Sequence, residues 1–291
     1  MGTPINAPLH VAALDGYLGT INNLLDQGAE IDAIIYDGGC PITPLHWAVG
    51  HTSAVRLLIE GGADIDGTIR GVGGTPLLYA CMYGYNDTVQ VLLENGADAD
   101  IATKLGMTPL FKACVQGHDD VVRTLVEHHA DVNIAATAGT CIDTHVPMVF
   151  FKAGVTPLHV ACVQLDTDTV ALLIENGALI DQATENGATP LYTACEYGYV
   201  HAARLLIDHG ADVDLAVEEM NRLTYDLTWR GGTTYKKPIV GLLRARIGIS
   251  MLLNVIGHQD EHPRRQRLRD LVPRIALYLA PRMESQPTTA T

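Results

Sequence analysis

The residues of this sequence whose types and spacing could do chemistry are few. Cys141, Asp143 and His145 alternate along one short stretch, and thiolate, carboxylate and imidazole groups are all ligands of zinc. A structural zinc site takes four ligands, and the ligands on one face of such a stretch supply only part of that set. We therefore expect no metal site here.

Catalytic motifs are missing from the sequence. It contains no glycine-rich dinucleotide fingerprint, no phosphate-binding loop, no G-x-S-x-G elbow and no H-E-x-x-H helix. Asp15 and Glu196 are isolated carboxylates, which are typical of solvated surfaces. The sequence therefore predicts a protein that is not an enzyme and binds no cofactor. A catalytic site on inserted loops stays an alternative, because such sites escape sequence patterns.

The element that recurs along the chain is a pair of short helices, written most clearly in residues 108–131. Thr108 is a good helix N-cap, and Pro109 suits the first helical position because its missing N–H is not needed there. Gly117 permits the left-handed residue that ends a short helix. Residues 121–126 then place apolar side chains on one stripe of a second helix.

This unit is repeated along the chain. Its starts, most of which read Thr-Pro-Leu, lie at Pro8, Thr43, Thr75, Thr108, Thr156 and Thr189. Its Gly-Ala ends, most of them followed by an acidic residue, lie at residues 28–30, 62–64, 96–98, 177–178 and 210–212. The steps from Thr75 to Thr108 and from Thr156 to Thr189 are both 33 residues. The pattern resembles the ankyrin repeat, with its T-P-L-H-x-A start and its G-A-D end.

The resemblance implies an all-α fold. We expect an ankyrin repeat solenoid of six clear helix-turn-helix repeats with hairpin fingers, plus a degenerate seventh repeat and a C-terminal helical cap. The predicted parts are a repeat domain at 1–216, an inserted loop with the seventh repeat at 217–257, a helical cap at 258–280 and a disordered tail at 281–291.

Histidine and cysteine take structural places in this pattern. His10, His46 and His159 are the fourth letter of the repeat motif, and in ankyrin families that histidine hydrogen-bonds within and between repeats. One slot of the first helix is cysteine in four repeats, namely Cys81, Cys114, Cys162 and Cys195. Other repeats place alanine or valine there, so we expect buried thiols that pack, as in a reducing cytoplasm or nucleus.

Charge is distributed unevenly. Residues 1–235 carry 9 Lys or Arg against 29 Asp or Glu, whereas residues 236–291 carry 10 against 4. An acidic body repels a phosphate backbone, so we expect no nucleic-acid binding by the repeats. No run of 18 apolar residues and no leader at Met1 are seen, which predicts a soluble protein that is neither secreted nor membrane-spanning. We expect a monomer in the cytoplasm or nucleus.

Three irregularities interrupt the repeats. The first helix of the second repeat is two residues short before Gly50, which should draw in the inner surface beside Trp47. Fifteen extra residues fall within 136–152, where ankyrin families carry the hairpin finger, and a second insertion of this kind follows residue 216. The aromatic residues of these insertions either touch a partner or cover the edge of the solenoid.

In the ankyrin family, partners are held on the concave face, which is formed by the exposed ends of the first helices and by the hairpin tips. The resemblance thus implies a non-catalytic protein–protein interaction module, whose protein partner the sequence does not identify. The predicted partner-binding residues are Met82, Tyr83, Lys104, Leu105, Met107, Gln116, Phe150, Phe151, Lys152, Gln164, Glu196, Tyr197 and Trp229.

The C-terminus suggests an alternative function. Residues 242–247, Leu-Leu-Arg-x-x-Ile, resemble the start of a SOCS box, and residues 271–279 resemble its end. Ankyrin repeats followed by such a box form substrate receptors of cullin ubiquitin ligases, whose partners would include cullin and elongin components. Leucine replaces the usual cysteine, and glycine replaces an arginine, so a simple capping repeat explains the same apolar pattern.

Overall fold

The computed structural model describes residues 6–37, 40–69, 73–137, 153–164, 167–216 and 218. The chain divides into two compact units, Met1–Pro190 and Leu191–Thr291, and each is described by itself. The predicted C-terminal parts at 217–257, 258–280 and 281–291 lie outside the described residues, apart from Glu218. Their boundaries stay predictions.

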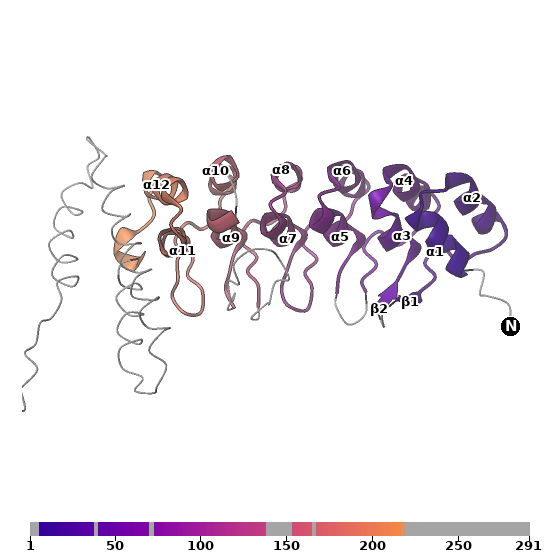
Figure 1. Ribbon diagram of the computed structural model, residues 1–291, viewed down its shortest axis with the longest axis horizontal. Coiled ribbons are helices and arrows are strands. Elements are labelled where there is room, and N and C mark those ends of the chain that lie inside the picture. The colour runs from indigo at the N-terminus through magenta and orange to yellow at the C-terminus, as the bar shows by residue number, and fades with distance from the viewer. Residues whose placement is uncertain are drawn as a thin grey trace, which may run out of the picture. The chain divides into compact units, whose positions relative to one another are not determined.

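The first unit is a stack of helix pairs (Figure 1). Its first helices are α1 (Asn6–Leu14), α3 (Pro44–Trp47), α5 (Pro76–Tyr83), α7 (Pro109–Gln116) and α9 (Pro157–Gln164). Its second helices are α2 (Leu18–Asp26), α4 (Thr52–Glu60), α6 (Asn86–Glu94), α8 (Asp119–Glu127) and α10 (Thr167–Glu175). The two sets form two parallel rows, so the predicted all-α ankyrin solenoid is confirmed.

The helix ends follow the predicted rules. The hydroxyl oxygen of Thr75 accepts a hydrogen bond from the N–H of Leu78 at 3.2 Å, and that of Thr108 accepts one from Phe111 at 3.1 Å. At the other end of α7, Gly117 has a φ of 75°, which a residue with a side chain rarely adopts. Local sequence thus sets where these helices begin and end.

The core lies between the two rows and between successive repeats. Leu45, Leu77, Leu110 and Leu158 occupy one position of the first helices and have at most 1% of their surface exposed. First helices pack on first helices of the next repeat, as α5 does on α7, and second helices do the same. Each fully buried leucine contributes roughly 1.5–3 kcal/mol through its removal from water. The predicted cysteines Cys81, Cys114, Cys162 and Cys195 are also buried.

The motif histidines join each first helix to the next hairpin, as predicted. Their Nε2–H groups donate to backbone carbonyl oxygens: His10 to Ile42 at 3.0 Å, His46 to Gly74 at 3.2 Å and His159 to Ala188 at 3.0 Å. Since a carbonyl only accepts, Nε2 of each ring carries the proton. Nδ1 of His46 and of His159 is then an acceptor for the motif threonine hydroxyls, at 2.7 and 2.8 Å.

Hairpins project from the row of first helices (Figure 1). The first has two strands, β1 (Ile35–Asp37) and β2 (Cys40–Ile42), which pair antiparallel. Ala136 and Val155, which lie on either side of the large insertion, form an antiparallel bridge, and residues 138–152 between them lie outside the described residues. Carboxylates also bond successive hairpins. Asp66, for example, accepts from the N–H of Asp98 at 3.0 Å.

The second unit includes helix α11 (Pro190–Tyr197), whose first residue is the last residue of the first unit, and helix α12 (Val200–Asp208). Leu191 on α11 and Leu206 on α12 are fully buried. Gly198 lies between the helices with a φ of 86°, as the glycine does in the other repeats. This unit therefore begins with one more helix pair of the same type.

Candidate protein-binding face

The second repeat departs from its neighbours at the end of its first helix. Here α3 has four residues and continues as a 3-10 turn, η1 (Ala48–Gly50), whereas α5 has eight residues. The two residues that are absent would correspond to Met82 and Tyr83 at the end of α5. The predicted shortening is thus confirmed, and it opens a gap in the row of helix ends.

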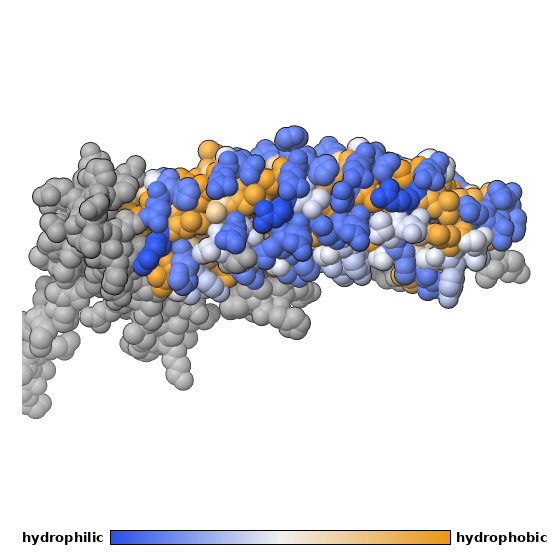
Figure 2. Space-filling model, turned by 90° about the horizontal axis from the view of Figure 1, so that it is seen from above, coloured by the Kyte–Doolittle hydropathy of each residue, from blue (hydrophilic) through white to orange (hydrophobic). Residues whose placement is uncertain are grey.

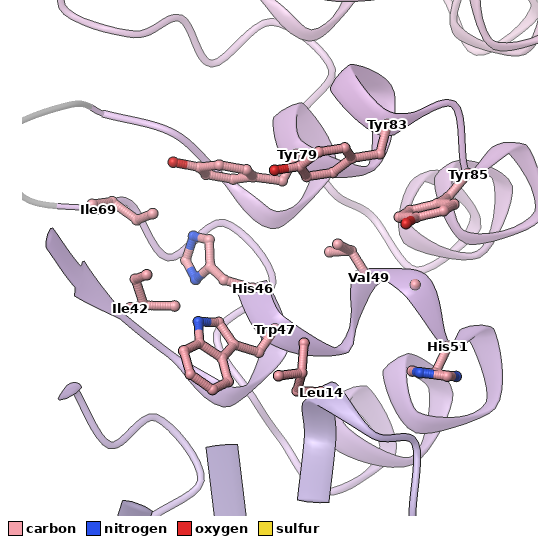
Figure 3. A pocket seen from close by; sticks show the side chains of 11 residues that line it. Leu14, Ile42, His46, Trp47, Val49, His51, Ile69, Tyr79, Tyr83 and Tyr85 are labelled. Atoms are coloured by element: carbon pink, nitrogen blue, oxygen red, sulfur yellow. The ribbon is translucent and has the colours of Figure 1, made fainter. Parts of the chain in front are cut away.

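A pocket with largely aromatic walls lies at this gap, and its volume is about 660 Å³. It is lined by Leu14, Ile42, His46, Trp47, Val49, Gly50, His51, Ile69, Tyr79, Tyr83 and Tyr85. Trp47 and Leu14 lie on one side of the pocket, and Tyr79 and Tyr83 lie on the other (Figure 3). Three successive repeats therefore contribute side chains to one pocket.

Ring contacts hold the aromatic walls in place. Trp47 meets the ring of His10 edge to face, with centroids 6.0 Å apart, and Tyr79 meets His46 in the same way at 5.9 Å. Tyr83 and Tyr85 lie 5.9 Å apart with their planes tilted by 36°. Because both histidines are anchored to hairpin carbonyls, the rings that they contact are positioned before any ligand binds.

The pocket wall is apolar and aromatic in composition. None of its lining residues is Asp, Glu, Lys or Arg. Burial lowers the pKa of His46 to about 4, so this ring is neutral at pH 7. Tyr83, Leu14 and Tyr85 are exposed by 55%, 49% and 41%, so water reaches this part of the wall. The pocket can therefore take up a flat or apolar group without displacing a fixed charge.

We call the exposed ends of α5, α7 and α9, together with the hairpin tips, the first-helix face. Tyr83 is exposed there, and Met82, Gln116 and Gln164 are half-buried at the helix ends. Lys104 and Leu105 are exposed at a hairpin tip. On the opposite side, the second helices present mainly hydrophilic side chains, with hydrophobic ones between them (Figure 2).

Met107 requires a correction, because only 8% of its surface is exposed. The hairpin turns back on itself through hydrogen bonds between Thr103 and Met107, with the N–H of Met107 donating to the threonine hydroxyl at 3.2 Å. This turn brings Met107 to the start of α7, where its side chain is shielded from solvent. It cannot serve as a contact on the surface in this conformation.

The other predicted residues fall in two groups. Glu196 and Tyr197 end α11 in the second unit and are half-buried. Phe150, Phe151, Lys152 and Trp229 lie outside the described residues, as do the stretches 242–247 and 271–279 that resemble a SOCS box. Their predicted roles stay predictions.

Sequence reasoning did not assign Leu14, Tyr79 and Tyr85 to the site. A signal for them existed in the two-residue shortening of the second repeat, because it exposes the helix ends on either side. Tyr85 directly follows the glycine that ends α5, and it turns toward Gly50 of the shortened repeat. The gap in the row of first-helix ends was predictable from the sequence. That Leu14, Tyr79 and Tyr85 line one pocket was not.

The described residues outside the pocket hold no group of metal ligands. Among the described residues, no three histidine, cysteine or acidic side chains meet in a group that could hold a metal ion. The Cys141 cluster lies outside them. Within the described ranges, no helix has the length and apolar composition needed to cross a bilayer.

Family models match most of the chain. A model of three ankyrin repeats matches residues 66–136 and 140–216, and a model of one ankyrin repeat matches residues 6–35 and 42–69. The chain belongs to the ankyrin repeat family. Ankyrin repeats are generally protein–protein interaction modules and typically have no catalytic activity. Among curated proteins, none gives a significant match.

Solved ankyrin repeat structures are similar to this one. The domain of Bcl-3, described as a unique member of the IkappaB protein family, is 28% identical, with a TM-score of 0.57 over 70% of this chain and 86% of that one. A domain from Acinetobacter baumannii AYE is 31% identical, with a TM-score of 0.58 over 70% and 98%. The human ASB11 ankyrin repeat domain is 27% identical, with a TM-score of 0.56 over 81% and 97%.

Proposed function

We propose that this ankyrin repeat protein binds a protein partner through the first-helix face of its first unit, and that it does so without catalysis. The observation that carries the proposal is the aromatic pocket, where Tyr83 is 55% exposed beside three further rings. Exposed aromatic side chains around a preformed hollow are typical of the centre of an interface, where a few anchors supply most of the binding energy.

The neighbouring repeats extend this surface. Gln116 and Gln164 follow Met82 along the row of helix ends, and all three are half-buried. Lys104 and Leu105 flank the row at a hairpin tip, and Leu105 is 41% exposed. Hydrogen-bonding side chains around an aromatic centre match the usual anatomy of an interface, in which a polar rim surrounds an apolar core.

Affinity capture with matched variants tests the proposal. The full chain is used as bait in cell lysate, and quantitative mass spectrometry compares it with a Tyr83→Ala, Gln116→Ala double variant. Gln90→Ala is the control, because this glutamine is exposed on the second helix α6. We expect the double variant to lose its specific partner by at least ten-fold, while the control retains it.

Melting curves accompany the capture, since both substitutions change surface side chains and should leave the fold intact. Equal recovery by the double variant and the control would refute the assignment of this face. Glu196 and Tyr197 occupy the same repeat position as Met82 and Tyr83, and a separate Tyr197→Ala variant tests their predicted contact. Recovery of cullin and elongin components would support the alternative function of the C-terminus.

A further inference from the structure

The aromatic pocket has walls of an unusual kind for a solvent-accessible hollow. Four of its lining side chains are aromatic: Trp47 ends α3 of the shortened repeat, and Tyr79, Tyr83 and Tyr85 belong to the next repeat. Aromatic faces carry partial negative charge, so several of them around one space attract a cation. None of the lining residues is Lys or Arg.

The first two repeats, which contribute most of the pocket's lining residues, are acidic in composition. Between residues 6 and 69, the described residues include eight Asp or Glu residues and a single Lys or Arg residue, Arg56. The carboxylates are Asp15, Asp26, Glu30, Asp32, Asp37, Glu60, Asp64 and Asp66. Asp15 directly follows the pocket residue Leu14. The charge of Asp64 acts on the pocket residue His46, where it opposes the lowering of the pKa by burial.

We propose that the aromatic pocket binds the guanidinium group of an arginine in a basic segment of the partner protein. This inference rests on the proposed function and names the partner chemistry that the site would select. The acidic repeats attract a positively charged segment of the partner. The aromatic rings then select arginine over the other residues of that segment.

Arginine fits these walls better than lysine does. A guanidinium group is planar, stacks on aromatic faces and is more weakly hydrated than an ammonium group, so it loses less on leaving water. Trp47 lies on one side of the pocket, Tyr79 and Tyr83 lie on the other, and the ring of His46 lies between them in this view (Figure 3). A flat group that enters the pocket therefore meets rings on more than one side. The hydroxyl groups of the tyrosines can accept hydrogen bonds from the guanidinium N–H donors.

The test is a peptide titration followed by NMR. The probe is acetyl-Gly-Gly-Arg-Gly-Gly-amide, and the comparison peptides carry citrulline, lysine or phenylalanine in place of arginine. Citrulline has nearly the shape of arginine without its charge. The signal is the indole N–H of Trp47, which is assigned by its loss in Trp47→Phe, since the chain has only two tryptophans.

We expect the arginine peptide to bind at least ten-fold more tightly than the citrulline peptide, and this ratio should shrink as salt is added. A ten-fold ratio corresponds to about 1.4 kcal/mol, which is within the range of cation–π contacts. Tyr83→Leu keeps an apolar side chain but removes a ring, and it should weaken arginine binding at least three-fold.

A second pair of variants offers a matched control. Tyr85 and Tyr199 hold the same repeat position and are both 41% exposed, but only Tyr85 lines the pocket. Tyr85→Leu should weaken arginine binding, and Tyr199→Leu should leave it unchanged.

Two results would overturn the inference, namely equal binding of the arginine and citrulline peptides, or tighter binding of the phenylalanine peptide. If either result is found and the Tyr83→Ala, Gln116→Ala variant still loses its partner in the capture experiment, this inference is refuted and the proposed function stands. Arginine selectivity without any effect of that variant on capture would refute the proposed function alone.

Discussion

Replacement of His159 by leucine should make the protein less sensitive to acid. The ring of His159 is almost fully buried, and burial lowers its pKa from 6.5 to about 4. Its Nδ1 accepts the hydroxyl proton of Thr156, so a proton added there would break this bond and place a charge in the core. Leucine is compatible with this position of the repeat, because Leu78 occupies it in the third repeat.

The magnitude follows from proton linkage. Below pH 6.5 the unfolded chain binds a proton at this histidine, while the folded chain binds one only near pH 4. The contribution of His159 to the free energy of unfolding is therefore fully present above pH 6.5, and it is lost as the pH falls toward 4. With these two pKa values, the loss from pH 7 to pH 5 is about 2 kcal/mol for His159.

Urea unfolding followed by circular dichroism at pH 7 and pH 5 measures this difference. His159→Leu should be less stable than wild type at pH 7, because the carbonyl of Ala188 loses its donor, at about 1–3 kcal/mol. Its further loss at pH 5 should be about 2 kcal/mol smaller than that of wild type. Val160→Ala, the next residue of α9, removes buried methyl groups and no titratable group, so it should keep the wild-type dependence on pH. The same pH dependence in His159→Leu and wild type would refute the argument.

Three further predictions concern packing, backbone conformation and thiol chemistry. Leu110→Ala should cost about 2–5 kcal/mol through the cavity it leaves, and Gln116→Ala should cost under about 0.5 kcal/mol; equal melting temperatures would contradict the assignment of faces. His129 has a φ of 64°, where five other repeats place glycine. His129→Gly should therefore raise the unfolding free energy by up to about 1 kcal/mol, and a loss of stability in urea would argue against backbone strain there. Burial raises the pKa of Cys195 to about 12, so its alkylation by iodoacetamide, followed by mass spectrometry, should be slow in the folded protein and fast in urea. Equal rates would show that this thiol is accessible.

The helix pairs were predictable because their signals are local. A threonine cap, a proline at the first helical position and a left-handed glycine all act within a few residues, as at Thr108, Pro109 and Gly117. The structural roles of His46 and His159 were predictable from the repeat motif. The deletion in the second repeat was visible from the spacing between Thr43 and Gly50.

The candidate site was less predictable, because exposure depends on contacts between residues that are distant in the sequence. Met107 was expected on the surface, yet the turn through Thr103 brings it into the core. Tyr85 follows the glycine that ends α5, and no sequence motif marks it as part of a site. It becomes a pocket wall only because the preceding repeat ends early.

The sequence by itself therefore determined the family, the order of the helices and the acidic character of the repeats, since these follow from motifs, periodicity and charge. Only the tertiary structure decided that Leu14, Trp47 and Tyr83 from three repeats enclose one pocket. The physical reason is that each repeat is specified by its own residues, whereas the space between two repeats is set by how their helices pack against each other.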